Sequence, residues 1–132
     1  MYTKNIKNHV YVCPTCLGKL EECKCQNLPF TLIQIDKHML PIIQELNRKF
    51  YRTTGCCEGH INSFDEIYVE FSKNYKIKTP LPKGFKKIYG GVCAQITGRT
   101  EQAKKRKKRE LLNSLYKWAC ELEPNGINPW IV

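Results

Sequence analysis

The chain has 132 residues, of which 42% are hydrophobic and 11% aromatic, a composition that excludes a disordered protein and allows one domain with an ordinary core. Its 22 Lys and Arg against 12 Asp and Glu give a formal net charge of +10. No apolar run approaches the roughly 20 residues of a membrane helix, and the N-terminus lacks the apolar stretch of a secretory signal, so we expect a cytoplasmic protein that does not span a membrane.

The first feature along the chain is a cluster of four cysteines, which the short predicted strand His9–Val12 precedes. Their spacing is Cys-x2-Cys-x6-Cys-x-Cys, and a reducing cytosol disfavours disulfides. Four thiols on two tight turns are the ligand set of a tetrahedral structural Zn²⁺. We therefore predict a zinc-knuckle module over residues 1–27, with an iron cluster or four unrelated thiols as the alternatives. The predicted zinc ligands are Cys13, Cys16, Cys23 and Cys25.

Residues 28–132 alternate between strand and helix patterns and predict an α+β domain, with a small mixed or antiparallel sheet and two main helices. After a β-rich stretch, Asp36 stands where a helix cap belongs, and an apolar stripe then follows helical spacing to about Phe50. Pro41 requires this helix to begin within about three residues of it. The remaining predicted elements are strands over residues 28–35 and 67–71, a connection over residues 72–84, and a helix from its cap Thr100 to about residue 122. Residues 86–90 and 92–97 are predicted as two further strands or one strand bent at Gly90 and Gly91.

A second unusual segment is Cys56-Cys57-Glu58-Gly59-His60, whose glycines predict a loop or sharp turn after the first helix. Three interpretations are open. Cys57 and His60 could join Cys56 or another residue at a second metal, or they could form a thiolate–imidazole pair for covalent chemistry. In the third, which we favour, Gly59 supplies an unusual backbone angle in a turn that either faces a ligand or is purely structural.

This segment carries a family resemblance. Residues 35–47 open with Asp36 and form an apolar-striped helix, and a short extended piece then leads to the Cys-Cys-Glu-Gly-His turn. The order resembles the opening of the tRNA wybutosine-synthesising methyltransferase family, whose turn is Ser-Cys-Ser-Gly-Arg. Cys57 and Gly59 agree with that turn, and the other three positions differ. The resemblance, over about residues 35–71, implies a turn that faces a nucleotide-like ligand. The segment is also similar to uncharacterised bacterial and phage proteins with a Cys-Cys-x-Gly-His turn.

The third feature is a run of six basic residues in the last predicted helix, whose apolar stripe begins only after the run. At roughly 100 degrees per residue these six side chains cannot share one face, so we expect the first half of the helix to project into solvent. The run either binds phosphates, with release of counterions, or only keeps the segment solvated. Its members are Lys104, Lys105, Arg106, Lys107, Lys108 and Arg109.

Four further side chains are predicted to be internal. Phe85 and Trp118 lie beside lysines and could stack on bases, but their strand and helical spacing favours the core. Cys93 and Cys120 are expected to be small buried apolar residues.

Together these features predict a small zinc-stabilised basic protein that binds a phosphate-rich ligand, first of all RNA or DNA. The ligand-binding residues would be Cys57, Gly59 and His60 together with the six cations of residues 104–109. The alternative is a phage or mobile-element protein that sequesters a nucleotide signal or inhibits a host protein. An enzyme that uses Cys57 and His60 is the least favoured hypothesis, and no catalytic residue is assigned.

Overall fold

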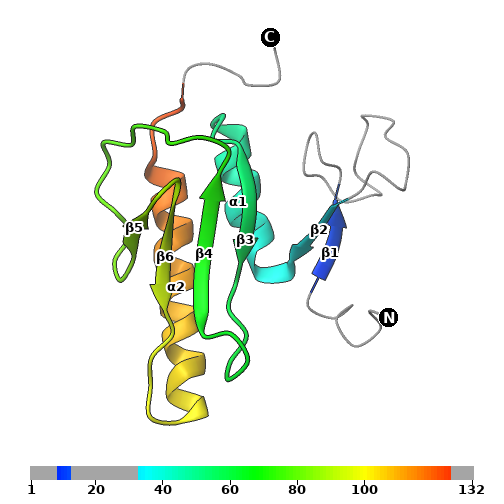
Figure 1. Ribbon diagram of the computed structural model, residues 1–132, viewed down its shortest axis with the longest axis vertical. Coiled ribbons are helices and arrows are strands. Elements are labelled where there is room, and N and C mark those ends of the chain that lie inside the picture. Colours follow the sequence, from blue (N-terminus) through cyan, green and yellow to red (C-terminus); the bar gives the residue numbers. More distant parts are fainter. Residues whose placement is uncertain (1–8, 13–32, 126–132) are drawn as a thin grey trace.

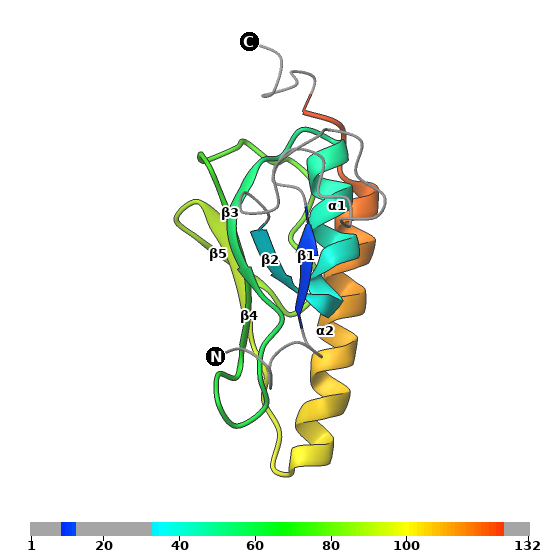
Figure 2. The same ribbon diagram turned by 90° about the vertical axis from the view of Figure 1, so that its right-hand side faces the viewer.

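The computed structural model describes residues 9–12 and 33–125. In these ranges the chain forms a four-stranded antiparallel sheet, two helices on one side of it, and a separate two-stranded sheet at its edge (Figures 1 and 2). The predicted α+β class is therefore confirmed. The predicted zinc ligands Cys13, Cys16, Cys23 and Cys25 lie outside the described residues.

None of the helices in the described ranges has the length and apolar character needed to cross a membrane.

The two-stranded sheet is formed by β1 (His9–Val12) and β2 (Ile33–Asp36), which pair antiparallel. His9 lies opposite Asp36, and Val12 lies opposite Ile33. The predicted strand before the cysteines therefore pairs with the predicted strand after them. Beyond β2 lies β3 (Thr53–Cys57), the edge strand of the larger sheet (Figure 1).

The four-stranded sheet has the order β3-β4-β6-β5, with β4 (Glu66–Phe71) and β6 (Gly91–Gln95) at its centre. Alternate residues of β4 are buried, because one face of the strand packs on the helices. β5 (Lys86–Ile88) and β6 form a hairpin through a two-residue turn at Tyr89 and Gly90, where Gly90 has a φ of +73°. The strands predicted over residues 67–71, 86–90 and 92–97 are thus confirmed. Tyr89 and Gly90 separate the last two.

Helix α1 (Leu40–Arg48) follows a 3-10 turn, η3 (Lys37–Met39). Pro41 lies in its first turn, where the missing N–H costs no hydrogen bond, as predicted. Helix α2 (Glu101–Glu121) begins after Thr100, whose Oγ1 accepts a hydrogen bond from the N–H of Ala103 at 3.0 Å. Both predicted helices are therefore present, and the predicted cap of the second is confirmed.

The hydrophobic core lies between the sheet and the two helices (Figure 2). Phe85 and Trp118 are buried in it and Cys93 is also buried, as predicted. The prediction for Cys120 was wrong, because this thiol is exposed. It follows directly after Ala119 on α2, and a step of roughly 100 degrees carries it away from the buried stripe.

Candidate functional site

The Cys-Cys-Glu-Gly-His segment begins inside a strand, not in the loop that its glycines predicted. Cys56 and Cys57 are the last residues of β3, where they lie opposite Val69 and Tyr68 of β4. Gly55 lies at an irregularity in the pairing of β3 with β4, of the kind that a β-bulge produces. Glycine in a strand often marks such a position. Successive strand residues point to opposite faces, so Cys56 packs against the core and Cys57 lies on the other face.

The chain turns sharply at Gly59, as predicted. Its φ is +83°, and a Cβ at this position would lie 2.4 Å from Cδ1 of Ile96. The backbone N–H of Gly59 donates to Sγ of Cys57 at 3.4 Å. The positive φ therefore favours glycine, and an added Cβ would also require the Ile96 side chain to shift. The turn brings His60 back toward the end of β2.

Three side chains meet where β2 and β3 end. Nε2 of His60 lies 3.3 Å from Oδ2 of Asp36, and the possible ligand atoms of Asp36, Cys57 and His60 all lie within 4.8 Å of one another. Asp36 is 7% and Cys57 9% exposed, whereas the His60 side chain is 36% exposed. This cluster could hold a metal ion, with access from the His60 side.

Asp36 was predicted as a helix cap, and that role was wrong. Its side chain makes no capping hydrogen bond to η3. Instead its Oδ2 accepts a hydrogen bond from the backbone N–H of Glu58 at 3.0 Å. The carboxylate is thus turned from the helix start toward the turn that follows β3.

Beside this cluster, the buried carboxylate of Glu58 has two side-chain partners, His38 and Lys108. Its Oε1 accepts from the backbone N–H of His38 at 2.9 Å, and its Oε2 accepts from Nδ1 of His38 and Nζ of Lys108, each at 2.8 Å. Burial on its own raises the pKa of Glu58, but the hydrogen bonds from Lys108 and His38 outweigh it and hold the pKa below its ordinary value. Glu58 is therefore a buried carboxylate that stays ionised at neutral pH.

The first half of α2 is docked on the protein, so the prediction that it projects into solvent was wrong. Nζ of Lys108 also donates to the carbonyl of Gly59 at 2.8 Å, and Nζ of Lys104 donates to Asp65 at 2.6 Å. Lys104 and Lys108 are four residues apart and continue the buried stripe at Leu111 and Leu115. The hydrophobic pattern did not indicate this packing, because the first half of α2 contacts buried and half-buried acidic side chains instead of apolar ones.

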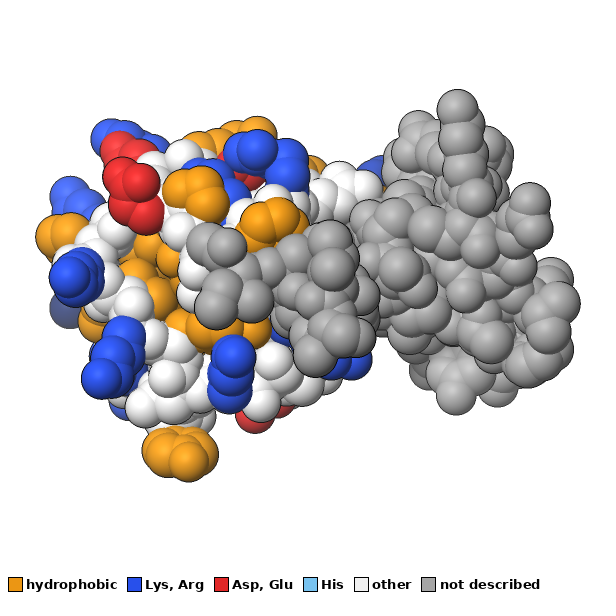
Figure 3. All heavy atoms as spheres, turned by 90° about the horizontal axis from the view of Figure 1, so that it is seen from above, with side chains coloured by type: hydrophobic (Ala, Val, Ile, Leu, Met, Phe, Trp, Pro, Cys, Tyr) orange, Lys and Arg blue, Asp and Glu red, His pale blue; other side chains and the backbone are white. Residues whose placement is uncertain are grey.

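The other four cations of the run behave differently. Lys105, Arg106 and Arg109 are exposed and Lys107 is half-buried. Within the described part of the chain, none of the four has an acidic partner. Figure 3 looks down on the molecule from above the view of Figure 1, and Lys and Arg side chains are scattered around this face. On α2, by contrast, three exposed cations fall within five consecutive residues of one helix.

A groove of about 380 Å³ separates this side of α2 from the start of α1. Its apolar wall includes Leu112 and Tyr116, which is 46% exposed, and Arg109 lies at its border. A pocket of this size can accommodate a small ligand. The full lining is His38, Pro41, Ile42, Arg109, Leu112, Asn113 and Tyr116.

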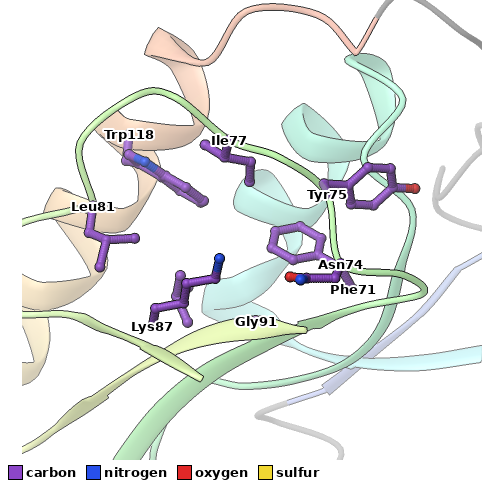
Figure 4. A pocket seen from close by; sticks show the side chains of 9 residues that line it. Phe71, Asn74, Tyr75, Ile77, Leu81, Lys87, Gly91 and Trp118 are labelled. Carbon is purple, nitrogen blue, oxygen red and sulfur yellow. The ribbon is translucent and has the colours of Figure 1, made fainter. Parts of the chain in front are cut away.

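A second cavity, between Trp118, Ile77 and Leu81, is too small for a ligand (Figure 4). Its volume of about 40 Å³ accommodates only a few water molecules. The groove between α1 and α2 is therefore the better ligand site of the two.

The two thiols of β3 are poor nucleophiles. Burial raises the pKa of Cys56 to about 12, with further contributions from Asp36, Cys57 and Glu58. Burial also raises the pKa of Cys57, as does the nearby charge of Asp36, although the N–H of Gly59 acts in the opposite sense. A thiol that attacks a substrate needs a lowered pKa, so this geometry does not favour the thiolate–imidazole hypothesis.

No protein-family model, curated protein or solved structure matches the chain.

Proposed function

We propose that this protein binds nucleic acid through the outer side of α2, and that Zn²⁺ bound by the four N-terminal cysteines stabilises the adjoining module. The observation that carries the proposal is that some cations of the basic run form ion pairs within the protein and others face solvent. Lys104 and Lys108 are neutralised by Asp65 and Glu58, whereas Lys105, Arg106 and Arg109 face solvent without acidic partners among the described residues. Docking of α2 on the protein therefore does not account for these three exposed cations.

The spacing of the exposed cations supports contact with a phosphate backbone. Lys105 and Arg109 are four residues apart and lie on the same side of α2, and Arg106 lies about 100 degrees around the helix from Lys105. Each phosphate that such a side chain neutralises releases counterions, which supplies affinity without base specificity. The run therefore provides a sequence-independent electrostatic contact.

The groove beside α2 favours a single-stranded ligand, whose bases are accessible. Tyr116 presents an exposed aromatic ring there, and Arg109 links the groove to the exposed cations. Stacking of a base on an aromatic side chain is worth roughly 1–3 kcal/mol and tolerates any sequence. The same groove supports a second candidate function, the binding of a single nucleotide, because its 380 Å³ lies in the range of small-molecule pockets.

The test is a fluorescence-anisotropy titration of the full chain with labelled single-stranded RNA and DNA at several salt concentrations. With four phosphates contacted, log K should fall against log salt with a slope of about −3. The variant Lys105→Gln/Arg106→Gln/Arg109→Gln should bind more weakly and reduce the slope to about −1, because one of four contacts remains.

The matched control is Lys76→Gln/Lys78→Gln/Lys83→Gln, which removes the same charge from exposed lysines of the β4–β5 connection. It should bind like the wild type. Equal loss of affinity in both triple variants would mean that net charge alone attracts the oligonucleotide, and no binding by the wild type would contradict the proposal. Competition by unlabelled AMP at low concentration, with no salt dependence, would favour the single-nucleotide function instead.

A further inference from the structure

We infer that Asp36, Cys57 and His60 bind one divalent transition-metal ion, with Zn²⁺ as the best match. Its three ligands are other residues than the four N-terminal cysteines, and the inference does not rest on the proposed binding of nucleic acid. Three arguments carry the inference: the distance between ligand atoms, the backbone around the thiol, and the chemistry of the three donors.

The first argument is the distance between the two harder donors. Nε2 of His60 and Oδ2 of Asp36 lie 3.3 Å apart. Two ligands bonded at about 2.0–2.1 Å to a tetrahedral Zn²⁺ lie roughly 3.3 Å from each other. The pair therefore has the separation that a shared ion requires, and Sγ of Cys57 lies within 4.8 Å of both ligand atoms.

The second argument is the backbone that holds the thiol. Cys57 and His60 are separated by two residues, a spacing at which one short turn presents two ligands to the same ion. Gly59 makes that turn possible through its φ of +83°, and its N–H donates to Sγ of Cys57. This hydrogen bond fixes the position of the sulfur near the other two ligand atoms.

The third ligand is also held in place. The backbone N–H of Glu58 donates to Oδ2 of Asp36 at 3.0 Å, and this fixes the carboxylate as the outer-shell partners of metal ligands do. The backbone N–H groups of Glu58 and Gly59 thus orient Asp36 and Cys57, and the chain then turns at Gly59 to place His60 beside them.

The third argument is the chemistry of the three donors, which identifies the class of ion. One sulfur, one imidazole nitrogen and one carboxylate oxygen suit Zn²⁺, whereas Mg²⁺ and Ca²⁺ take oxygen ligands. Three protein ligands leave the fourth tetrahedral position for water, on the side where His60 is partly exposed.

The experiment counts zinc ions in the full chain by native mass spectrometry after loading with Zn²⁺ and removal of excess metal. Cys57→Ala and His60→Ala should each hold one zinc fewer than the wild type. The four N-terminal cysteines are unchanged in every variant. The difference in zinc count therefore reports only the site of Asp36, Cys57 and His60, whatever the N-terminal cysteines bind.

The matched control is Cys56→Ala, which removes the neighbouring thiol from the opposite face of β3 and should leave the zinc count unchanged. Circular dichroism checks that each variant is folded. His60→Ala removes a partly exposed side chain and keeps the test valid if Cys57→Ala does not fold. Equal counts in the wild type and His60→Ala, or a zinc lost equally in Cys56→Ala, would overturn the inference.

A spectroscopic readout identifies the sulfur. The wild type loaded with Co²⁺ should show a thiolate-to-cobalt charge-transfer band larger than that of Cys57→Ala by the contribution of one thiolate. An identical band in the two proteins would exclude Cys57 as a ligand and contradict the inferred site.

Discussion

At the scale of single residues, Gly59 determines how the end of β3 is arranged. The sequence predicted its unusual backbone angle correctly, because a glycine inside a polar five-residue segment has few other uses. Asp36 could not be identified in the same way. It is 21 positions from Cys57, and only the packing of β2 beside β3 brings the carboxylate to the thiol.

Replacement of Gly59 by alanine tests both constraints on this residue. Gly90→Ala is the control, because Gly90 also has a positive φ, but the nearest atom to an added Cβ is 3.9 Å away. A non-glycine residue in this conformation costs roughly 1 kcal/mol or more in either case. The contact with Ile96 should make Gly59→Ala the more destabilising by at least about 1 kcal/mol. Urea unfolding of both variants measures this, and equal losses would show that Ile96 moves aside freely.

At the scale of secondary-structure elements, α2 combines two kinds of inner face. Its second half packs through Leu111, Leu115 and Trp118, which the sequence pattern predicted from their spacing. Its first half packs through Lys104 and Lys108 against acids of the loop between β3 and β4. That half was not predictable, since a lysine that forms a partly buried ion pair and one that faces solvent look the same in a sequence.

Lys49 joins the ends of the two helices. Its side chain is buried, and Nζ donates to the carbonyls of Ala119 and Cys120 in the last turn of α2. These carbonyls have no partner within the helix, so a cation there completes their hydrogen bonding and complements the helix dipole. Asn125 reinforces the joint by donating its backbone N–H to the carbonyl of Lys49 at 2.8 Å.

We therefore expect Lys49→Met to destabilise the protein by about 1–3 kcal/mol, because it leaves the buried carbonyl of Ala119 and the partly buried carbonyl of Cys120 without this donor. The neighbouring Arg48→Met is the matched control. Arg48 is exposed and, among the described residues, forms an ion pair with Glu45 alone, so its loss should cost about 0.5 kcal/mol or less. Thermal unfolding of the two variants gives the comparison. A Lys49→Met protein as stable as Arg48→Met would show that water replaces the ammonium group.

At the scale of the whole molecule, the apolar core and the charged sites occupy different regions. The core lies between the sheet, α1 and the second half of α2. The ion pairs of Lys104 and Lys108, and the Asp36–Cys57–His60 cluster, lie beyond its margin. The α+β class was predictable because hydrophobic periodicity reports which residues enter a core. The site was predictable only in part: the sequence grouped Cys57 with His60, but Asp36 joins them only through the packing of β2 beside β3.

This division predicts uneven stability along α2. Amide hydrogens near Lys104 and Lys108 should exchange with solvent faster than those near Leu115 and Trp118, because ion pairs at the margin hold the first half less firmly than the core holds the second. Hydrogen–deuterium exchange with mass spectrometry measures both halves in one experiment. Uniform protection along α2 would mean that the ion pairs hold the helix as firmly as the core does.

The pairing of β1 with β2 also has a consequence for the cysteines between them. Because Val12 lies opposite Ile33, this pairing brings together the two ends of the sequence that contains these cysteines. Closing a loop costs entropy that grows with its length, and a first closure shortens the loop left for a second. Any metal that joined Cys13 and Cys16 to Cys23 and Cys25 would therefore bind more tightly when β1 and β2 are paired. By the same linkage, such a metal would hold the two strands together, and its removal should weaken their pairing without the loss of any contact between them.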